Sequence, residues 1–318
     1  MNTVKKIKDK MSREYGDFSG SFPEVAVSKR STDGTVKLLL RYADGTAIES
    51  VIMPFRRRDT VCLSTQAGCA MGCTFCRTGA SRLRRNLTSR EILAQYLTCY
   101  QWIIDDRQKA HIPKPNIVFM GEGEPLHNFD AVKEACGLLL SRRGVSLGPR
   151  QITLSTCGYL PGLRRVRELG PVHIALSLHS ALSHKRQKLI PLEKSSPLVE
   201  ILPLLAKLPL RKNQFINFEY LLIQNFNDRE EDAEALLELT SPFKAIVNII
   251  PLNPAFGSPW KAPDEETVSR FKAMLVARDI RTMVRISRGR DIEAACGQLS
   301  GKELPGAQSP AGGSEPQD

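Results

Sequence analysis

Three cysteines stand close together in the stretch GCAMGCTFCRTG, residues 68–79. Cys69, Cys73 and Cys76 follow the spacing C-x3-C-x2-C, which lets one loop wrap three thiolates around a small inorganic centre. Zinc in closed structural sites prefers four ligands, usually from paired C-x2-C motifs, and the other five cysteines are dispersed along the chain. A [4Fe-4S] cluster commonly takes four cysteines, so three would leave one iron open to a small molecule. The spacing favours this cluster, with a structural zinc completed by a distant ligand as the alternative.

The charge of the chain points to an anionic partner. The net charge is +11 and the pI about 9.4, which favours nucleic acid, although solubility alone would also account for it. Two arginine-rich runs, residues 56–58 and 82–85, flank the cysteine stretch. No uncharged apolar run approaches the roughly 18 residues of a membrane span, and the basic N-terminus has no apolar segment behind it. We therefore expect a cytoplasmic protein without a membrane partner, whose thiols stay reduced.

The elements that must position these cysteines alternate between strands and helices. A hairpin is expected over residues 35–53, with Asp44-Gly45 as its turn. A helix is expected from Ser89 to Asp105, because Thr88 and Glu91 form a capping box. Further strands are expected at residues 60–65, 116–121, 151–156, 172–179, 215–223, 244–253 and 282–287, and helices at 129–140, 196–208, 230–240 and 265–279.

Such alternation predicts βαβ units and a parallel sheet. The expected fold class is α/β, a partial (β/α)6 TIM-like barrel with a small N-terminal β-hairpin extension. Sites in such folds lie at the C-terminal ends of the strands, where the cysteine stretch and the motifs GEGEP, STCG and SLH all fall. The expected division is a flexible segment over 1–24, the hairpin extension over 25–60, the core barrel over 61–300 and a disordered tail over 301–318.

The cysteine motif, with Phe75 before its last cysteine, resembles that of the radical S-adenosylmethionine (SAM) superfamily. More specifically, the chain from about Asp33 to Gly301 resembles the RlmN/Cfr family of RNA adenine methyltransferases, and lies closer to RlmN. The motifs that carry the resemblance are CLSTQAGCAMGCTFCRTG, RNLTSREI, VFMGEGEPLHNFDAV, ITLSTCGYLPGL, IALSLHSA, FEYLLIQNFND, NIIPLNPAFGSPW and RDIEAACGQL. The resemblance implies that Cys69, Cys73 and Cys76 hold a [4Fe-4S] cluster whose open iron binds SAM, and that SAM is cleaved to a 5′-deoxyadenosyl radical.

Three further residues gain a catalytic role through this resemblance. Cys296 would be methylated by one SAM and then lose a hydrogen atom to the radical, so that two SAM are used per turnover. The resulting carbon radical would add to adenine, and Cys62 would form a disulfide with Cys296 to release the methylated base. Glu49 matches the family's proton acceptor. On residue type alone, each cysteine is as readily a buried small hydrophobe, and Glu49 an exposed strand residue.

The resemblance also implies a SAM site at the strand ends. Without it, the polar members of this set would be read as strand-end groups satisfied locally. The sequence departs from the family pattern at Glu122, where methionine is usual, and at Ile286 and Arg290 near Cys296. The implied SAM residues are Gly123 and Glu124, which would take the methionyl amine, together with Ser155, Ser177, Leu178, His179 and Asn253.

The expected activity is methylation of C2 of an adenine in 23S rRNA, with tRNA as a further candidate and an electron donor such as flavodoxin or ferredoxin. The family usually carries an N-terminal helical domain, whereas the match here begins near residue 33. We therefore expect recognition of RNA through the barrel face and basic loops, or a different substrate. The alternatives are Cfr-like C8 methylation, a paralogue with another RNA or small-molecule substrate, and a non-enzymatic metal-cluster protein that binds RNA.

Overall fold

A computed structural model of the chain describes residues 3–109, 112–254 and 259–299. Ten of the strands form one continuous sheet in the order β1-β2-β3-β4-β7-β8-β9-β10-β11-β12, and β5 and β6 form a separate antiparallel pair. The strands are β1 Glu24–Arg30, β2 Val36–Arg41, β3 Ala47–Met53, β4 Thr60–Cys62, β5 Gln66–Ala67, β6 Arg85–Asn86, β7 Asn116–Phe119, β8 Ile152–Thr156, β9 His173–Ser177, β10 Ile216–Leu222, β11 Ala245–Pro251 and β12 Thr282–Val284.

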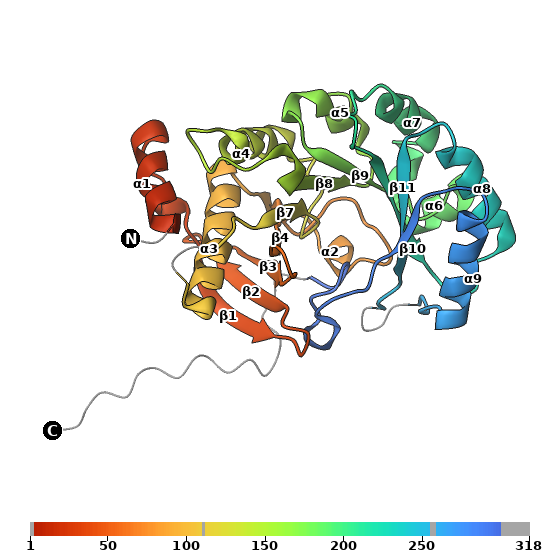
Figure 1. Ribbon diagram of the computed structural model, residues 1–318, viewed down its shortest axis with the longest axis horizontal. Coiled ribbons are helices and arrows are strands. Elements are labelled where there is room, and N and C mark those ends of the chain that lie inside the picture. The colour runs from red at the N-terminus through yellow and green to blue at the C-terminus, as the bar shows by residue number, and fades with distance from the viewer. Residues whose placement is uncertain (1–2, 110–111, 255–258, 300–318) are drawn as a thin grey trace.

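From β4 onward every neighbouring pair of strands in the large sheet is parallel. Helices connect these strands and lie on the outside of the curved sheet, while α2 and the cysteine stretch lie within its curve (Figure 1). This arrangement confirms the predicted partial TIM-like barrel. The helices are α1 Thr3–Tyr15, α2 Arg77–Ala80, α3 Ser89–Arg107, α4 Phe129–Leu140, α5 Leu160–Leu163, α6 Ser183–Leu189, α7 Leu198–Ala206, α8 Glu230–Thr240 and α9 Glu265–Val276.

The main apolar core lies between the sheet and these helices. Alternate residues of the parallel strands face this core, as Ile152 and Leu154 of β8 do. The first barrel helix, α3, begins at the predicted capping box, in which the Glu91 N–H donates to the Thr88 hydroxyl at 3.2 Å and the Glu91 carboxylate accepts from the Thr88 N–H at 2.8 Å. Across the described part of the chain, no helix combines the length and apolar character needed to cross a bilayer.

The hairpin extension has three strands, because β1 pairs with β2 in addition to the predicted β2–β3 pair. The β2–β3 turn lies at Asp44-Gly45 as expected, with Gly45 at φ +80°. The third strand, β3, pairs with β4 of the barrel, so that Val51 lies opposite Cys62. The proposed boundary at residue 60 therefore crosses a continuous sheet, and the hairpin forms one wall of the barrel.

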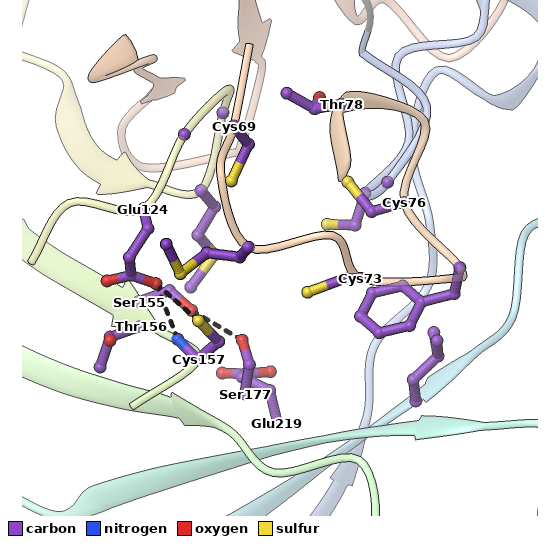
Figure 2. A pocket seen from close by; sticks show the side chains of 18 of the residues that line it. Cys69, Cys73, Cys76, Thr78, Glu124, Ser155, Thr156, Cys157, Ser177 and Glu219 are labelled. Carbon is purple, nitrogen blue, oxygen red and sulfur yellow. Dashed lines mark hydrogen bonds between the residues drawn. The ribbon is translucent and has the colours of Figure 1, made fainter. Parts of the chain in front are cut away.

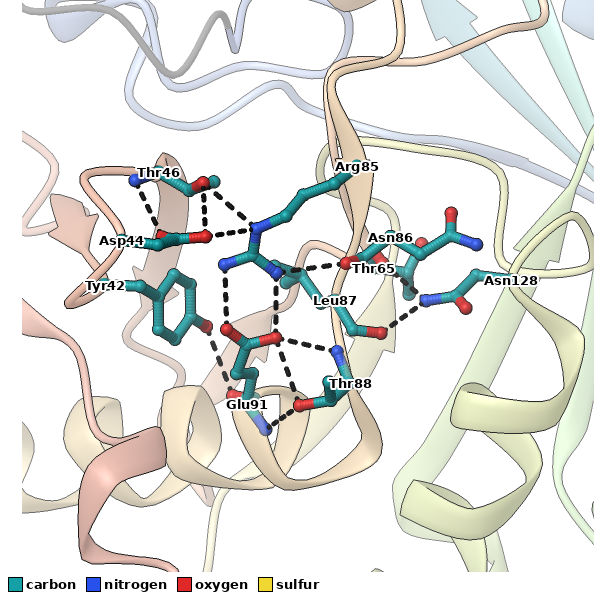
Figure 3. A network of polar contacts seen from close by, with 10 residues as sticks. All are labelled: Tyr42, Asp44, Thr46, Thr65, Arg85, Asn86, Leu87, Thr88, Glu91 and Asn128. Carbon is teal, nitrogen blue, oxygen red and sulfur yellow. Dashed lines mark hydrogen bonds and ion pairs between the residues drawn. The ribbon is translucent and has the colours of Figure 1, made fainter.

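A network centred on Arg85 ties this hairpin to the barrel (Figure 3). Its guanidinium pairs with Asp44 of the hairpin turn at 2.7 Å and with Glu91 of α3 at 2.8 Å. The neighbouring Arg84 donates to the Ala47 carbonyl at 3.0 Å. Part of the basic run at 82–85 therefore serves internal contacts, and less of it is available to a substrate than its sequence suggested.

The prediction of a flexible segment over residues 1–24 is wrong. Helix α1 occupies most of it and buries Val4, Ile7 and Met11. These three side chains form a single apolar stripe on an otherwise basic helix, and packing against α3 is enough to fix them. The tail predicted over 301–318 lies outside the described residues.

Candidate active site

A cavity opens at the C-terminal ends of the parallel strands, as the fold predicts (Figure 2). It contains about 1060 Å³ of empty space, its open mouth included. Most of its wall comes from the cysteine loop, which we define as residues 68–79, and from the loops after β7, β8 and β9. The predicted residues that line it are Cys69, Cys73, Cys76, Gly123, Glu124, Ser155, Ser177, His179 and Cys296.

The cysteine loop presents its three thiols to one cavity (Figure 2). Burial raises the pKa of the Cys69 thiol to about 12 and raises the pKa of both Cys73 and Cys76, so a metal centre would displace their protons on binding. Thiolates around one tetrahedral zinc lie within about 4 Å of one another. Among the described residues, no three Cys, His, Asp or Glu side chains converge closely enough to hold a single ion. Three soft ligands spread around a shared space fit an iron–sulfur cluster better than zinc.

A fourth thiol in the cavity, Cys157, is already engaged. Its Sγ donates to Glu124 Oε2 at 3.1 Å, and its backbone N–H donates to the same oxygen at 2.9 Å. The other oxygen of Glu124 accepts from the Leu126 N–H at 2.9 Å. Burial raises the pKa of Glu124, and these donors oppose the shift. Glu124 thus fastens the loop after β7 to the loop after β8, and Cys157 is the donor that satisfies it.

The two acidic residues of the GEGEP motif point in different directions. Gly123 between them has φ +94°, and a Cβ there would lie 2.5 Å from the Gln66 side chain, so only glycine fits. Glu124 faces the cavity, whereas Glu122 is buried outside it. The Glu122 carboxylate accepts from the Glu49 N–H at 2.8 Å and from the Gly68 N–H at 3.4 Å. The residue that departs from the family pattern therefore joins the hairpin to the start of the cysteine loop.

The SLH segment supplies a neutral histidine to the cavity wall. Burial lowers the pKa of His179 to about 3, and its Nδ1 accepts from the Leu221 N–H at 3.1 Å. Its ring meets Phe75 of the cysteine loop edge-on at 4.8 Å between centroids. The Ser155 and Ser177 hydroxyls lie 3.3 Å apart at the ends of β8 and β9.

Four predicted residues do not line the cavity. Leu178 is buried in the main core. Asn253 donates to the Ser287 hydroxyl and so ties the end of β11 to the segment after β12. Cys62 and Glu49 lie behind the wall, on the hairpin side.

Cys296 lies in residues 285–299, which we call the C-terminal segment. This segment crosses the open side of the barrel. This segment leaves β12 and crosses to the hairpin (Figure 1), where the Gly289 N–H donates to Asp33 at 3.0 Å. Cys296 is exposed at the cavity and enclosed by protein elsewhere, and this desolvation raises the pKa of its thiol to about 11. Cys62 is buried beside Ala294 and Leu299. Its pKa is raised by burial and then by the nearby charge of Cys296.

The Glu49 side chain is an internal ion-pair partner, not the exposed strand residue of the alternative reading. Its Oε1 lies 2.9 Å from Lys37 Nζ, and the two side chains are 3% and 5% exposed. Lys37 also donates to the Glu293 carbonyl at 3.0 Å. The carboxylate therefore lies beneath the C-terminal segment, with a cation beside it.

The cavity also contains a carboxyl group that the sequence analysis missed. Glu219 of β10 lines the wall and accepts from Asn248 Nδ2 at 2.9 Å. Burial raises its pKa, whereas Arg285 lowers it, and its charge also acts on Cys296. A lone acidic residue inside the apolar run FINFEYLLI was the available signal.

Comparison with known proteins gives consistent matches. The Radical SAM superfamily profile matches residues 63–237. The dual-specificity RNA methyltransferase RlmN of Nitratidesulfovibrio vulgaris (strain DP4) is 41% identical over 303 residues, covering 94% of this chain and 83% of that protein. The probable dual-specificity RNA methyltransferase RlmN of Moorella thermoacetica is 44% identical, covering 90% and 82%. The crystal structure of a radical SAM methyltransferase from Sphaerobacter thermophilus superposes with a TM-score of 0.84 at 36% identity, covering 94% of this chain and 86% of that one.

Proposed function

Because the chain belongs to the radical SAM superfamily and, within it, to the RlmN family of RNA methyltransferases, we propose that it methylates C2 of an adenine in 23S rRNA, with tRNA as a second substrate. The observation that carries this proposal is the position of Cys296. Its accessible thiol faces the same cavity as the three cysteines of the cysteine loop, with the Cys62 thiol behind it. A protein that only bound RNA would have no use for two further thiols in this arrangement.

The residues around the cavity fit a [4Fe-4S] cluster and SAM. Cys69, Cys73 and Cys76 would hold the cluster, which, once reduced, supplies with SAM the radical that the reaction needs. The SAM methionyl group would bind beside Gly123 and Glu124. The remaining polar groups of SAM would bind Ser155, Ser177 and His179 at the strand ends. The backbone of Leu178 would also contribute, and Asn253 would act at the edge of the site. The electron that reduces the cluster would come from a donor such as flavodoxin or ferredoxin. The reaction would take place in the cytoplasm.

The protein's own part in the chemistry is to carry and release a methyl group. Cys296 accepts the methyl group from one SAM, gives up a hydrogen atom when a second SAM is consumed, and bonds through that carbon to the adenine. Carbons C2 and C8 of adenine are electron-poor and carry no acidic proton, so they do not displace a methyl group from SAM. A carbon radical carried on the Cys296 sulfur can add to them instead. Glu49 takes the ring proton. The Cys62 thiol then bonds to the Cys296 sulfur as the bond from that sulfur to the methylene carbon breaks, and this carbon takes a proton to complete the methyl group. The unpaired electron left by the radical addition would return to the iron–sulfur cluster, and the methylated base leaves.

The target adenine must leave its stack to reach the cavity. The basic surface of the chain supplies phosphate contacts, so binding should weaken as salt rises. The base would enter on the side of the cavity next to Cys296, because the Cys296 thiol is exposed there.

Mass spectrometry of nucleosides tests the proposal. RNA from 23S rRNA or tRNA is incubated with the anaerobically reconstituted chain, SAM and a reductant. We expect 2-methyladenosine from the wild type and none from Cys296→Ala. Cys136→Ala is the matched control, because Cys136 is a buried cysteine of α4 outside the cavity. 8-Methyladenosine would move the protein to the Cfr type of reaction, and absence of any methylated adenosine from both RNAs would overturn the proposal.

A further inference from the structure

Lys37 and Glu49 lie on the inner face of the hairpin wall. In the antiparallel β2–β3 pair, Lys37 is opposite Val51, and Glu49 is opposite Leu39. Residues directly opposite each other point to the same face, so Lys37 and Glu49 are diagonal neighbours. Val51 in turn pairs with Cys62 of β4, which places that cysteine on the same face.

The two faces of this hairpin have different neighbours. Leu38, Leu40 and Ile48 on the outer face belong to the main core beneath α3. Val51 on the inner face packs in a separate apolar cluster with Cys62 and with residues 294 and 299 of the C-terminal segment. The inner face is therefore the face turned toward Cys296.

One buried ammonium group joins the Glu49 carboxylate to the segment that carries Cys296. Lys37 Nζ lies 2.9 Å from Glu49 Oε1 and 3.0 Å from the carbonyl oxygen of Glu293. Burying such a pair is costly, and a well-packed apolar pair of similar volume is often as stable or more stable. The outer face of the hairpin already packs into the main core, so the buried pair on its inner face points to a role in the reaction.

The C-terminal segment has a second anchor, which holds it both before and after Cys296. The Glu293 carboxylate pairs with Arg77 at 2.8 Å, and the Arg77 N–H donates to the Gly297 carbonyl at 2.7 Å. The Thr78 hydroxyl donates to the Leu299 carbonyl at 2.6 Å. Arg77 and Thr78 belong to α2, directly after the last cysteine of the cysteine loop. Cys296 is thus held between α2 and Lys37.

A second carboxylate lies close to Glu49. Glu122 accepts a hydrogen bond from the Glu49 N–H, and the charges of the two side chains repel each other. Lys37 Nζ, 2.9 Å from Glu49 Oε1, places a cation beside this pair of carboxylates.

We propose that Lys37 is a positioning residue, which holds the Glu49 carboxylate in an ion pair beside the segment that carries Cys296. This inference rests on the proposed role of Glu49. In the step concerned, the bond between the adenine carbon and its hydrogen breaks, the electron pair stays in the ring, and the proton goes to Glu49. Lys37 takes no part in the proton transfer.

The test compares Lys37→Met with Lys37→Arg in the reconstituted full chain. Both 5′-deoxyadenosine and methylated adenosine are measured in the same reaction. General-base catalysis contributes roughly 10²–10⁴-fold, so we expect Lys37→Met to lower the methylated product per 5′-deoxyadenosine at least about tenfold. Lys37→Arg keeps the charge and should restore the ratio to within about threefold of wild type. An unchanged ratio in Lys37→Met would overturn the inference.

A double variant separates positioning from general damage. If Lys37 acts through Glu49, Lys37→Met should add no further loss in a Glu49→Gln background, where the pair is removed as a whole. Losses that multiply would mean that Lys37 acts by another route, and would count against the inference. Lys185→Met is the matched control, because Lys185 forms a comparable ion pair with Asp232 at 2.7 Å and is 11% exposed. It should leave the product ratio unchanged.

Hydrogen exchange of the protein without its cluster gives a readout that needs no catalysis. Loss of the Lys37 contact should speed exchange at residues 293–297 in Lys37→Met and leave it near wild type in Lys37→Arg. Equal exchange in all three proteins would count against the inference. Wild-type protein that forms no methylated adenosine would instead contradict the proposed function of the whole site, so the two failures are distinguishable.

Discussion

The cysteine loop and the C-terminal segment both line the cavity and meet where Arg77 and Thr78 contact residues 293–299, yet they are held in different ways. The cysteine loop is fixed mainly by its backbone: the Cys76 N–H donates to the Cys73 carbonyl at 3.1 Å, and the Thr74 N–H donates to the Leu189 carbonyl at 3.0 Å. The C-terminal segment is held largely by side chains, with Lys37 on one side and Arg77 on the other.

This difference separates two kinds of sensitivity. A substitution that removes one of the three thiols of the cysteine loop should remove all of the chemistry. A substitution that touches the C-terminal segment should spare cleavage of SAM and disturb a later step. The following predictions test that distinction, from the largest expected effect to the smallest.

Cys76→Ala should abolish both SAM cleavage and methylation, because one of the three cluster ligands is lost. Iron content of the reconstituted protein and 5′-deoxyadenosine formation measure the effect, and both should fall to background. The circular dichroism spectrum should not change, since the loop's backbone hydrogen bonds do not use the thiol. Cys99→Ala on α3 is the control and should retain iron. Wild-type levels of 5′-deoxyadenosine from Cys76→Ala would remove the contrast between the two regions.

Cys62→Ala should preserve SAM cleavage and trap a covalent protein–RNA adduct. The thiol that resolves the bond to Cys296 is then missing, while every cavity-lining residue remains. Denaturing gel electrophoresis with labelled RNA detects the adduct, and Cys136→Ala should give none. Free methylated RNA at the normal rate from Cys62→Ala would exclude this cysteine from the mechanism.

Glu122→Gln tests the residue that joins the hairpin to the start of the cysteine loop. Burial raises the pKa of Glu122 to about 7 from 4.5, so the folded protein holds this proton more tightly than the unfolded chain does. The stabilisation is therefore complete below about pH 4.5 and is lost as pH rises through 7, by up to about 3 kcal/mol. Because glutamine does not titrate, the free energy of unfolding of the Glu122→Gln variant should fall less over this pH range than that of the wild type.

Denaturant unfolding of the cluster-free protein between pH 5 and 8 measures this effect. Glu230→Gln, at an exposed position on α8, is the control and should follow the wild-type curve. If Glu122→Gln follows that curve as well, the Glu122 carboxyl group does not carry the pH dependence.

Thr88→Ala should cost about 1 kcal/mol of stability, because the α3 cap loses its side-chain acceptor. The melting temperature should fall by roughly 2–4 °C, and the ratio of methylated product to 5′-deoxyadenosine should stay unchanged. Thr98→Ala in the middle of the same helix removes no cap and should not destabilise the protein. A changed product ratio in Thr88→Ala would show that the distinction between the two regions is less sharp than proposed.

How well each region could be predicted from the sequence depends on whether local spacing or distant contacts determine it. The cysteine loop was identifiable because C-x3-C-x2-C is a local spacing, and α4 and α8 have the predicted bounds because their apolar periods are local as well. The pairing of Lys37 with Glu49 depends on strand register and on the crossing of the C-terminal segment, and neither can be read from spacing. Glu219 was missed for the same reason, because only the folding of the barrel brings it near Cys296.

The crossing of the C-terminal segment has a consequence for biosynthesis. The cluster thiols leave the ribosome early, whereas Cys296 emerges among the last of the described residues. A chain whose translation stops early would contain the cysteine loop and most of the barrel but lack Cys296, the thiol that we propose as the acceptor of the methyl group. Such a product could neither become methylated nor remain bonded to RNA, so interrupted translation would yield an inert fragment instead of one that blocks its own substrate.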